Sequence, residues 1–165
     1  MLVPLGAVDR AEVVALNERN QHLTAPMDDH RLEYLASVGT VEVIRHEDRF
    51  AGFVITMPGD SAYDSSNFAW FARRYESFDY LDRIVIHERF RRRGLGALTY
   101  DEVEARTAQR ARLLALEVNS DPPNPGSIAF HASRGYEQVG ERDFDDHRVA
   151  LLVKRFREPG PPVDR

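Results

Sequence analysis

The chain has 165 residues, 42% of them hydrophobic and 30% charged, which is typical of a soluble globular protein large enough to bury a core. Its net charge of −5 argues against general binding to nucleic acid or to an acidic membrane. Cysteine is absent, which excludes disulfides, thiolate metal ligands and a cysteine nucleophile. No apolar run approaches the roughly 20 residues of a membrane span, and Asp9 and Arg10 come too early for a secretory signal, so a cytoplasmic location is expected.

The N-terminal part of the chain is expected to form a short strand, two helices and a strand pair. Residues 2–5 suit a strand, and residues 7–20 carry apolar side chains at helical spacing. A second helix over residues 28–38 begins with acidic side chains, which the helix dipole favours at that end. Residues 41–45 and 50–57 are rich in β-branched and aromatic side chains, and the polar residues between them predict a hairpin turn.

Residues 58–79 form a long connection that is unusually rich in aromatic side chains. A connection of this length is uncommon in a compact domain and is usually functional when it occurs. We expect it to pack against the rest of the protein as a lid, with a short helix over residues 67–75. The alternative is that its aromatic side chains only seal the core or form a homodimer contact.

The second half of the chain alternates strands with helices. Strands are expected at residues 80–86, 113–118, 137–142 and 148–156. Helices are expected at residues 94–110 and 126–134, and Gly135 suits the cap of the second one. This order predicts a mixed α/β sheet in a single domain over residues 1–157. The tail, residues 158–165, contains three prolines and a glycine and is expected to fray.

The turn after residue 86 carries the clearest chemical signal, Arg91-Arg92-Arg93-Gly94-Leu95-Gly96. Glycine lets the backbone approach a bulky anion, and the unpaired N–H groups at a helix start attract negative charge. Arginine adds charge-assisted contacts to phosphate oxygens. The turn is therefore a candidate pyrophosphate site, and the alternative is an ordinary solvated turn. A nucleotide P-loop is excluded because no Gly-Lys-Ser/Thr is present, and Thr99 stands where a dinucleotide fingerprint needs a third glycine or alanine.

This turn resembles the Gln/Arg-x-x-Gly-x-Gly/Ala motif of the GCN5-related N-acetyltransferase (GNAT) superfamily, although Glu88 stands where that family often has proline. A second segment, from Asn124 through His131 to Gly135-Tyr136, resembles the family's Asn-x-x-Ala/Ser block. The resemblance covers most of residues 2–156, apart from the insertion at residues 58–79. It implies a mixed, mostly antiparallel sheet of about seven strands flanked by about four helices.

The resemblance also implies an acyl donor, acetyl-CoA, and the residues that hold it. The strand before the turn would pair with the pantetheine arm, and the turn would bind the pyrophosphate. The residues assigned in this way are Ile84, Val85, Ile86, Arg91, Arg92, Arg93, Gly94, Leu95, Gly96, Asn124, Phe130 and His131. For Asn124 the alternative is a helix N-cap, a position that asparagine favours.

His131 stands where many relatives carry a tyrosine that protonates the departing thiolate. Histidinium could do the same near neutral pH, since the ordinary pKa values are about 6.5 for histidine and about 8.5 for a thiol. The alternative is a histidine that packs against the cofactor or hydrogen-bonds its sulfur. No pair of histidines has metal-ligand spacing, so no metal site is expected.

A general base is harder to assign from the sequence. Asp82 and Glu88 flank the cofactor strand, and Glu42 lies on an earlier strand. Strand alternation places Asp82 on the same side as Ile84 and Ile86. Surface salt bridges are the alternative role of each carboxylate, and a chain of water molecules is the alternative base.

The function implied by the resemblance is transfer of an acetyl group from acetyl-CoA to a primary amine by direct attack in a ternary complex. The acceptor would be a small amine or a peptide N-terminus, contacted by Trp70, Phe71 and Tyr75 of the insertion. The alternative is a non-catalytic acyl-CoA-binding module on the same fold. Nucleic-acid binding through Arg89–Arg93 would need a broader basic face than one turn.

Overall fold

The computed structural model describes residues 1–156, and the predicted tail at residues 158–165 lies outside this range. Within it, the strands are β1 (Leu2–Pro4), β2 (Thr40–His46), β3 (Arg49–Pro58), β4 (Phe78–Ile86), β5 (Leu113–Asp121), β6 (Glu137–Asp143) and β7 (Arg148–Arg155). The helices are α1 (Arg10–Arg19), α2 (Asp29–Val38), α3 (Ser66–Ala72), α4 (Leu95–Arg110) and α5 (Pro125–Ser133), with short 3-10 helices η1 (Ala7–Asp9) and η2 (Glu88–Phe90). None of the helices within residues 1–156 is long and apolar enough to cross a membrane.

The strands form one sheet in the order β1-β2-β3-β4-β5-β7-β6. Every neighbouring pair is antiparallel except β4 and β5, which are parallel and are joined by the crossover helix α4. The predicted fold class, a mixed and mostly antiparallel sheet of about seven strands, is confirmed. The described residues contain five α-helices rather than about four, because α3 forms inside the long connection.

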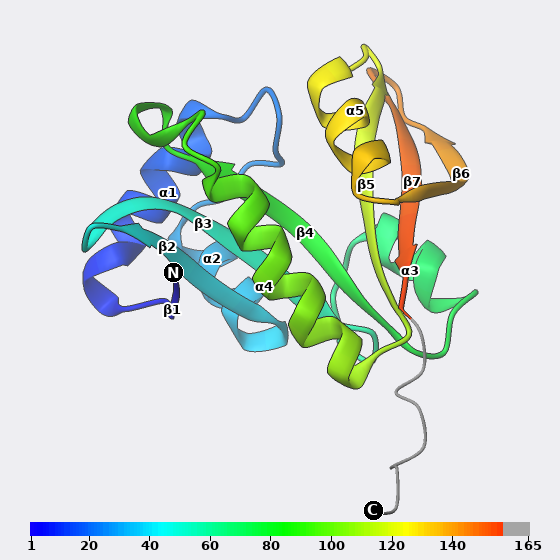
Figure 1. The fold of residues 1–165 in the computed structure, drawn as a ribbon, viewed down its shortest axis with the longest axis horizontal. Coiled ribbons are helices and arrows are strands. Elements are labelled where there is room, and N and C mark those ends of the chain that lie inside the picture. Colours follow the sequence, from blue (N-terminus) through cyan, green and yellow to red (C-terminus); the bar gives the residue numbers. More distant parts are fainter. Residues whose placement is uncertain (157–165) are drawn as a thin grey trace, which may run out of the picture.

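Helices cover both faces of the sheet (Figure 1). On one face α1, α2 and α3 bury the larger core, which includes Leu16, Leu35 and Phe71. On the other face α4 and α5 pack over a second core, which includes Val103 and Leu116. The central strands are therefore buried on both sides, which explains why their sequences read as nearly continuous apolar runs.

The parallel strands β4 and β5 separate partway along their length. They pair over Phe78–Tyr80, opposite Leu113–Ala115, and then diverge, although β4 continues to Ile86 and β5 to Asp121. Figure 1 shows the two strands opening as a V, with α4 in front of it and α5 beside its β5 arm. Beyond the fork, the facing edges of the two strands have no partner strand within residues 1–156.

A β-bulge in β4 lies at this fork. Leu81 is opposite Thr56 and Arg83 is opposite Ile55, so Asp82 is an extra residue on the β4 side. A bulge bends its strand and increases the local twist, which helps to turn β4 away from β5.

Because of this bulge, the side chain of Asp82 points to the opposite side of the sheet from the one that the sequence predicts. Its carboxylate accepts hydrogen bonds from the Tyr63 hydroxyl and from Arg83 Nε, on the α1–α3 face of the sheet. Ile84 packs on the opposite side, against the core under α4. Simple alternation fails because one residue is inserted between two paired positions.

Candidate active site

The loop before α4 leaves its backbone open to a ligand. Gly94 is the N-cap of α4 in the left-handed region, with φ 76°, and Arg92 has φ 60°. Glycine has no side chain with which to cap the helix, so the first N–H groups of α4 lack a capping acceptor. A Cβ atom added to Gly94 or Gly96 would meet nothing within 4 Å among the described residues. Open space and backbone N–H groups without a capping acceptor therefore occur together at the turn where the sequence predicts a bound anion.

The loop is anchored from below by apolar side chains. Phe90 and Leu95 are buried together with Ile44 and Ala51 in a small separate core. Arg93 lies over the Phe90 ring, with Cζ 5.7 Å from the ring centroid. These contacts fix the base of the loop while Gly94 stays exposed.

Arg91 is directed away from the start of α4. Its Nη2 donates to Asn20 Oδ1 at 3.0 Å, and its Nε donates to the Ile86 carbonyl at 3.3 Å. Arg91 thus ties the loop to the end of α1. The structure leaves Arg92 and Arg93 exposed beside the helix start.

The open strand edges beyond the fork suit an extended polar ligand. Ile84 and Ile86 pack toward the α4 face, and Val85 packs toward the α1–α3 face. On β5, Ser120 Oγ is buried without a hydrogen-bond partner among the described residues. An amide-containing chain lying between the strands could pair with both edges and supply a partner for this hydroxyl.

Helix α5 begins and ends as the sequence predicts. Asn124 Oδ1 accepts a hydrogen bond from the Ser127 N–H at 3.2 Å, so Asn124 is an N-cap. Gly135 has φ 84°, and the Tyr136 N–H donates to the His131 carbonyl, which closes the helix with a Schellman motif. A contact of Asn124 with the cofactor stays a prediction.

His131 is buried, and both of its ring nitrogens have partners. Nδ1 lies 2.7 Å from the Ser127 carbonyl, which can only accept, so Nδ1 carries a proton. Nε2 lies 2.7 Å from the Tyr100 hydroxyl and accepts from it in the neutral ring. Burial lowers the pKa of His131 below its ordinary value, so the ring is neutral at pH 7. This argues against the histidinium donor expected from the sequence.

Phe130 is half-buried next to this pair. Its ring meets Tyr100 edge to face, with ring centroids 5.1 Å apart. Phe130 therefore lies at the α5 side of the fork, where the sequence places a cofactor contact.

Asp82 is committed to a network within the protein. It pairs with Arg83 Nε at 2.6 Å, and both side chains are about 6% exposed. Arg83 Nη1 also donates to Asn17 Oδ1 and to the Ala25 carbonyl, at 3.0 and 2.8 Å. Asp82 therefore holds Arg83, which in turn connects β4 to α1 and to the segment between α1 and α2.

The other two carboxylates pair with basic side chains, Glu88 at the surface and Glu42 in a buried position. Glu88 is exposed in η2, 3.5 Å from His87 Nδ1, and its pKa is lowered, chiefly by a backbone hydrogen bond. A lowered pKa makes Glu88 a weaker proton acceptor. Glu42 forms a two-bond salt bridge with Arg106, at 2.8 and 2.7 Å.

Glu117 is a carboxylate that the sequence reading missed. It lies on β5 two residues beyond Ala115, the last β5 residue paired with β4, so it stands at the fork. It accepts a hydrogen bond from the Tyr80 hydroxyl, and the Asn67 side chain also interacts with it. Burial, with a smaller effect of the Asp82 charge, raises its pKa to about 7, against the opposing effect of these hydrogen bonds. The signal in the sequence that could have identified Glu117 is a carboxylate inside an otherwise apolar strand.

The model of the acetyltransferase (GNAT) family matches residues 9–136 of the chain. The chain belongs to the GNAT family. Among curated proteins, none matches it by sequence.

Solved GNAT structures share the fold across nearly the whole chain. The ribosomal-protein-S18-alanine N-acetyltransferase of Escherichia coli superposes with a TM-score of 0.73 at 16% identity, covering 100% of this chain and 99% of that one. The ribosomal-protein-alanine N-acetyltransferase of Brucella melitensis gives 0.68 at 18% identity, over 94% and 99% of the two chains. Arabidopsis thaliana NAA60, in complex with a bisubstrate analogue, gives 0.72 at 13% identity, over 96% and 99%.

In this GNAT chain the aromatic residues predicted to contact substrate do not form one site. Phe71 is fully buried in the core, where a substrate cannot reach it. Trp70 packs on β6, where a Cβ atom added to Gly140 would lie 2.7 Å from Trp70 Cζ2. The alternative, that these aromatic side chains seal the core, describes both residues.

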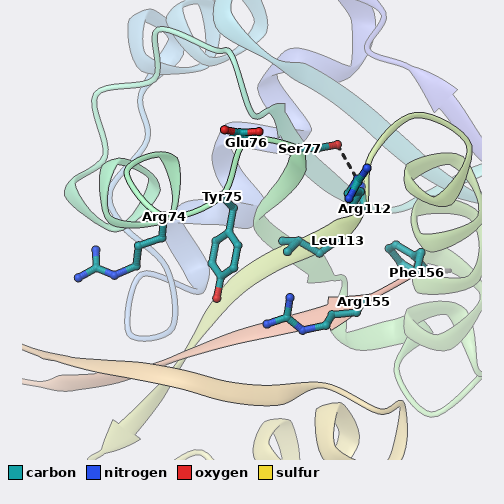
Figure 2. A pocket seen from close by; sticks show the side chains of 8 residues that line it. All are labelled: Arg74, Tyr75, Glu76, Ser77, Arg112, Leu113, Arg155 and Phe156. Carbon is teal, nitrogen blue, oxygen red and sulfur yellow. Dashed lines mark hydrogen bonds between the residues drawn. The ribbon is translucent and has the colours of Figure 1, made fainter. Parts of the chain in front are cut away.

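Tyr75 lies at the other end of the GNAT sheet. It lines a pocket of about 670 Å³ at the paired ends of β4 and β5, shown in Figure 2, together with Leu113 and Phe156. Three arginines, Arg74, Arg112 and Arg155, complete much of its wall. Tyr75 is thus at the paired ends of β4 and β5, whereas the loop before α4 follows the opposite end of β4, beyond the fork.

The part of the GNAT chain that the structure describes has no group of three or more histidine or acidic side chains arranged to hold a metal ion.

Proposed function

We propose that this GNAT protein is an acetyl-CoA-dependent N-acetyltransferase that acetylates a primary amine by direct attack in a ternary complex. The observation that carries the proposal is the fork of β4 and β5, which opens toward the uncapped start of α4. Family membership and the shared fold support acetyl transfer in general. We further propose a role for each of the residues named below.

The donor would lie in the open part of the fork. The N–H groups of residues 92–96 and the exposed Arg92 and Arg93 would hold the pyrophosphate, and the edges of β4 at Ile84–Ile86 would pair with the pantetheine arm. Asn124 and Phe130 border this path from α5. Acetyl-CoA itself supplies the acetyl group as a reactive thioester.

Glu117 would act as the general base. A protonated amine must lose a proton before its nitrogen can attack, and a carboxylate with a pKa of about 7 accepts a proton readily near neutral pH. Glu117 stands at the fork with a neutral hydrogen-bond partner, the Tyr80 hydroxyl, whereas Asp82 is paired with the Arg83 guanidinium. Direct attack needs no covalent enzyme intermediate, which suits a chain without cysteine.

His131 is not assigned as the general acid, because its ring is neutral and both nitrogens are engaged. A thiolate with an ordinary pKa of about 8.5 is a good leaving group without a protein acid. In this proposal His131 orients Tyr100 beneath α5.

The acceptor would be a cationic primary amine. Asp82 and Glu117 place two carboxyl groups near the fork, which favours an ammonium group over a neutral or acidic one. One structural neighbour is named for the alanine of a ribosomal protein, so peptide N-termini belong beside small amines among the candidates. A cytoplasmic location and a homodimer stay predictions.

Release of free thiol from acetyl-CoA, measured with a panel of small amines and peptides, tests the proposal. We expect turnover with at least one acceptor, and Glu117→Gln should lower kcat by about 10²–10⁴-fold, the usual contribution of a general base. Glu88→Gln should retain activity, since Glu88 is exposed outside the cleft. Acetyl-CoA binding without turnover for any amine would contradict the proposal and favour the acyl-CoA-binding module.

A further inference from the structure

Helix α3 lies across three strands beside Glu117. Glu117 of β5 is opposite Leu151 of β7, and Leu151 is in turn opposite Gly140 of β6. Asn67, in the first turn of α3, contacts Glu117, and Trp70, three residues later, packs on Gly140. The side chains of α3 thus reach from Glu117 on β5 to Gly140 on β6.

Several contacts fix α3 in this place. Ser65 Oγ accepts from the Phe68 N–H at 3.3 Å and caps the helix. Phe68 and Phe71 are buried in the core under it, and Gly140 leaves the space that Trp70 occupies. The position of Asn67 relative to the sheet is therefore defined by packing on both sides of it.

We propose that Asn67 is a positioning residue for Glu117, with its amide oriented by Arg142 of β6. Arg142 Nη1 donates to Asn67 Oδ1 at 2.9 Å and to Ser66 Oγ at 2.9 Å. A guanidinium group has donors only, so the oxygen of the amide must face Arg142. The NH₂ group of Asn67 is then left to donate to the Glu117 carboxylate. This inference rests on the proposed role of Glu117 as the general base.

The two donors to Glu117 oppose the effect of burial. The Asn67 amide and the Tyr80 hydroxyl both stabilise the charged carboxylate and lower its pKa. Asp82 on β4 raises it and Arg83 lowers it, while Leu151 on β7 contributes no charge. Tyr63 is hydrogen-bonded to Asp82 and is itself neutral, because burial raises its pKa. Asn67 thus helps to keep the base ionised near pH 7.

The test measures the Glu117 pKa directly and through turnover. Protein labelled with ¹³C at glutamate carboxyl carbons is titrated by NMR, with Glu117→Gln used to assign the signal. In Asn67→Leu, which keeps the side-chain size, the Glu117 pKa should rise by roughly one unit, since a hydrogen bond to a charged group contributes about 1.5–3 kcal/mol. The acid limb of the kcat/KM profile should move to higher pH by the same amount, and activity should recover at high pH.

Two further variants complete the design. Ser66→Ala removes the other contact of Arg142 on the same helical turn and should leave both the Glu117 pKa and the pH profile unchanged. Arg142→Met keeps Asn67 but frees its amide to turn, so it should raise the Glu117 pKa by less than Asn67→Leu does. It also serves as the test if Asn67→Leu fails to fold by circular dichroism.

The outcomes separate this inference from the proposed function. A Glu117 pKa that stays unchanged in Asn67→Leu and Arg142→Met would overturn the positioning role and leave the base role standing. A raised Glu117 pKa with an unmoved kcat/KM profile would show that Glu117 is not the base. That result would overturn the proposed mechanism and, with it, the role of Asn67.

Discussion

At the scale of single residues, the proposed chemistry depends on one carboxylate whose burial opposes its charge. Glu117 is partly buried at the fork of β4 and β5, where burial raises its pKa to about 7. The Tyr80 and Asn67 donors limit that rise. A group in this position is a better proton acceptor than an exposed carboxylate, and it makes folding sensitive to pH.

The stability of the wild type relative to Glu117→Gln should fall as pH rises. The folded-state pKa is raised from 4.5 to about 7, so the carboxyl group stabilises the fold most below pH 4.5, and that contribution is lost as pH rises through 7. Allowing for partial exposure, the difference in unfolding free energy should shift by roughly 2 kcal/mol toward the variant between pH 5 and pH 8. Denaturant titrations at several pH values measure it, and parallel pH dependences of the two proteins would contradict it.

His131 should be neutral, with its proton on Nδ1, at pH 7 and above. Its pKa is lowered chiefly by burial, and Nδ1 faces a carbonyl that can only accept a hydrogen bond. Long-range ¹H–¹⁵N correlation spectra distinguish the two neutral tautomers and the charged ring. A doubly protonated ring at pH 7 would restore the histidinium donor expected from the sequence.

The sequence could not identify the proposed base, Glu117, because the pKa of this residue depends on tertiary partners. Asp82 and Glu88 are the predicted candidates because they flank the cofactor strand. A β-bulge, however, turns Asp82 toward Arg83, and Glu88 is exposed. Glu117 depends on Tyr80 of a neighbouring strand and Asn67 of a distant helix. Only its place inside an apolar strand was visible beforehand.

At the scale of elements, the loop and the start of α4 form a unit whose geometry is set locally. Gly94 adopts φ 76°, which glycine accepts without strain, and α4 begins at the next residue. The order of strands and helices and the Gly135 cap were predicted for the same reason, since they depend on neighbours in the sequence. For residues 58–79 the sequence left two roles open, a substrate lid and a seal of the core, because a buried aromatic side chain and a substrate-binding one look alike in a sequence.

Gly96→Asp should abolish CoA binding without destabilising the protein. A carboxylate in the first turn of α4 interacts favourably with the helix dipole and replaces a flexible glycine, so thermal stability should be kept or raised. The same charge should repel a pyrophosphate, and calorimetry should detect no binding. His30→Asp, which adds a carboxylate to the first turn of α2, is the matched control and should bind CoA normally. Normal CoA binding by Gly96→Asp would contradict the loop assignment.

At the scale of the whole molecule, the helical layers and the bulge together set the course of β4 and β5. Helices α1–α3 and α4–α5 bury opposite faces of the sheet, and β4 and β5 diverge between them (Figure 1). Arg83 connects β4 to the segment after α1, and Arg91 connects the loop before α4 to the end of α1. In the proposed mechanism, acetyl-CoA and the amine bind side by side at this fork.

Initial-rate kinetics should show a sequential mechanism. If acetyl-CoA and the amine occupy the cleft together, double-reciprocal plots at several fixed amine concentrations should intersect, because both substrates bind before any product leaves. Parallel lines would indicate a covalent acetyl-enzyme and contradict direct attack.

Amide chemical shifts of ¹⁵N-labelled protein, followed during titration with CoA, show which backbone amides meet the cofactor. We expect the largest changes at residues 92–97 and along β4 from Ile84 to Ile86, and no change at the amides of Arg74–Ser77 in the distant pocket. Changes confined to that pocket, or a loop before α4 that does not respond to CoA, would contradict this expectation.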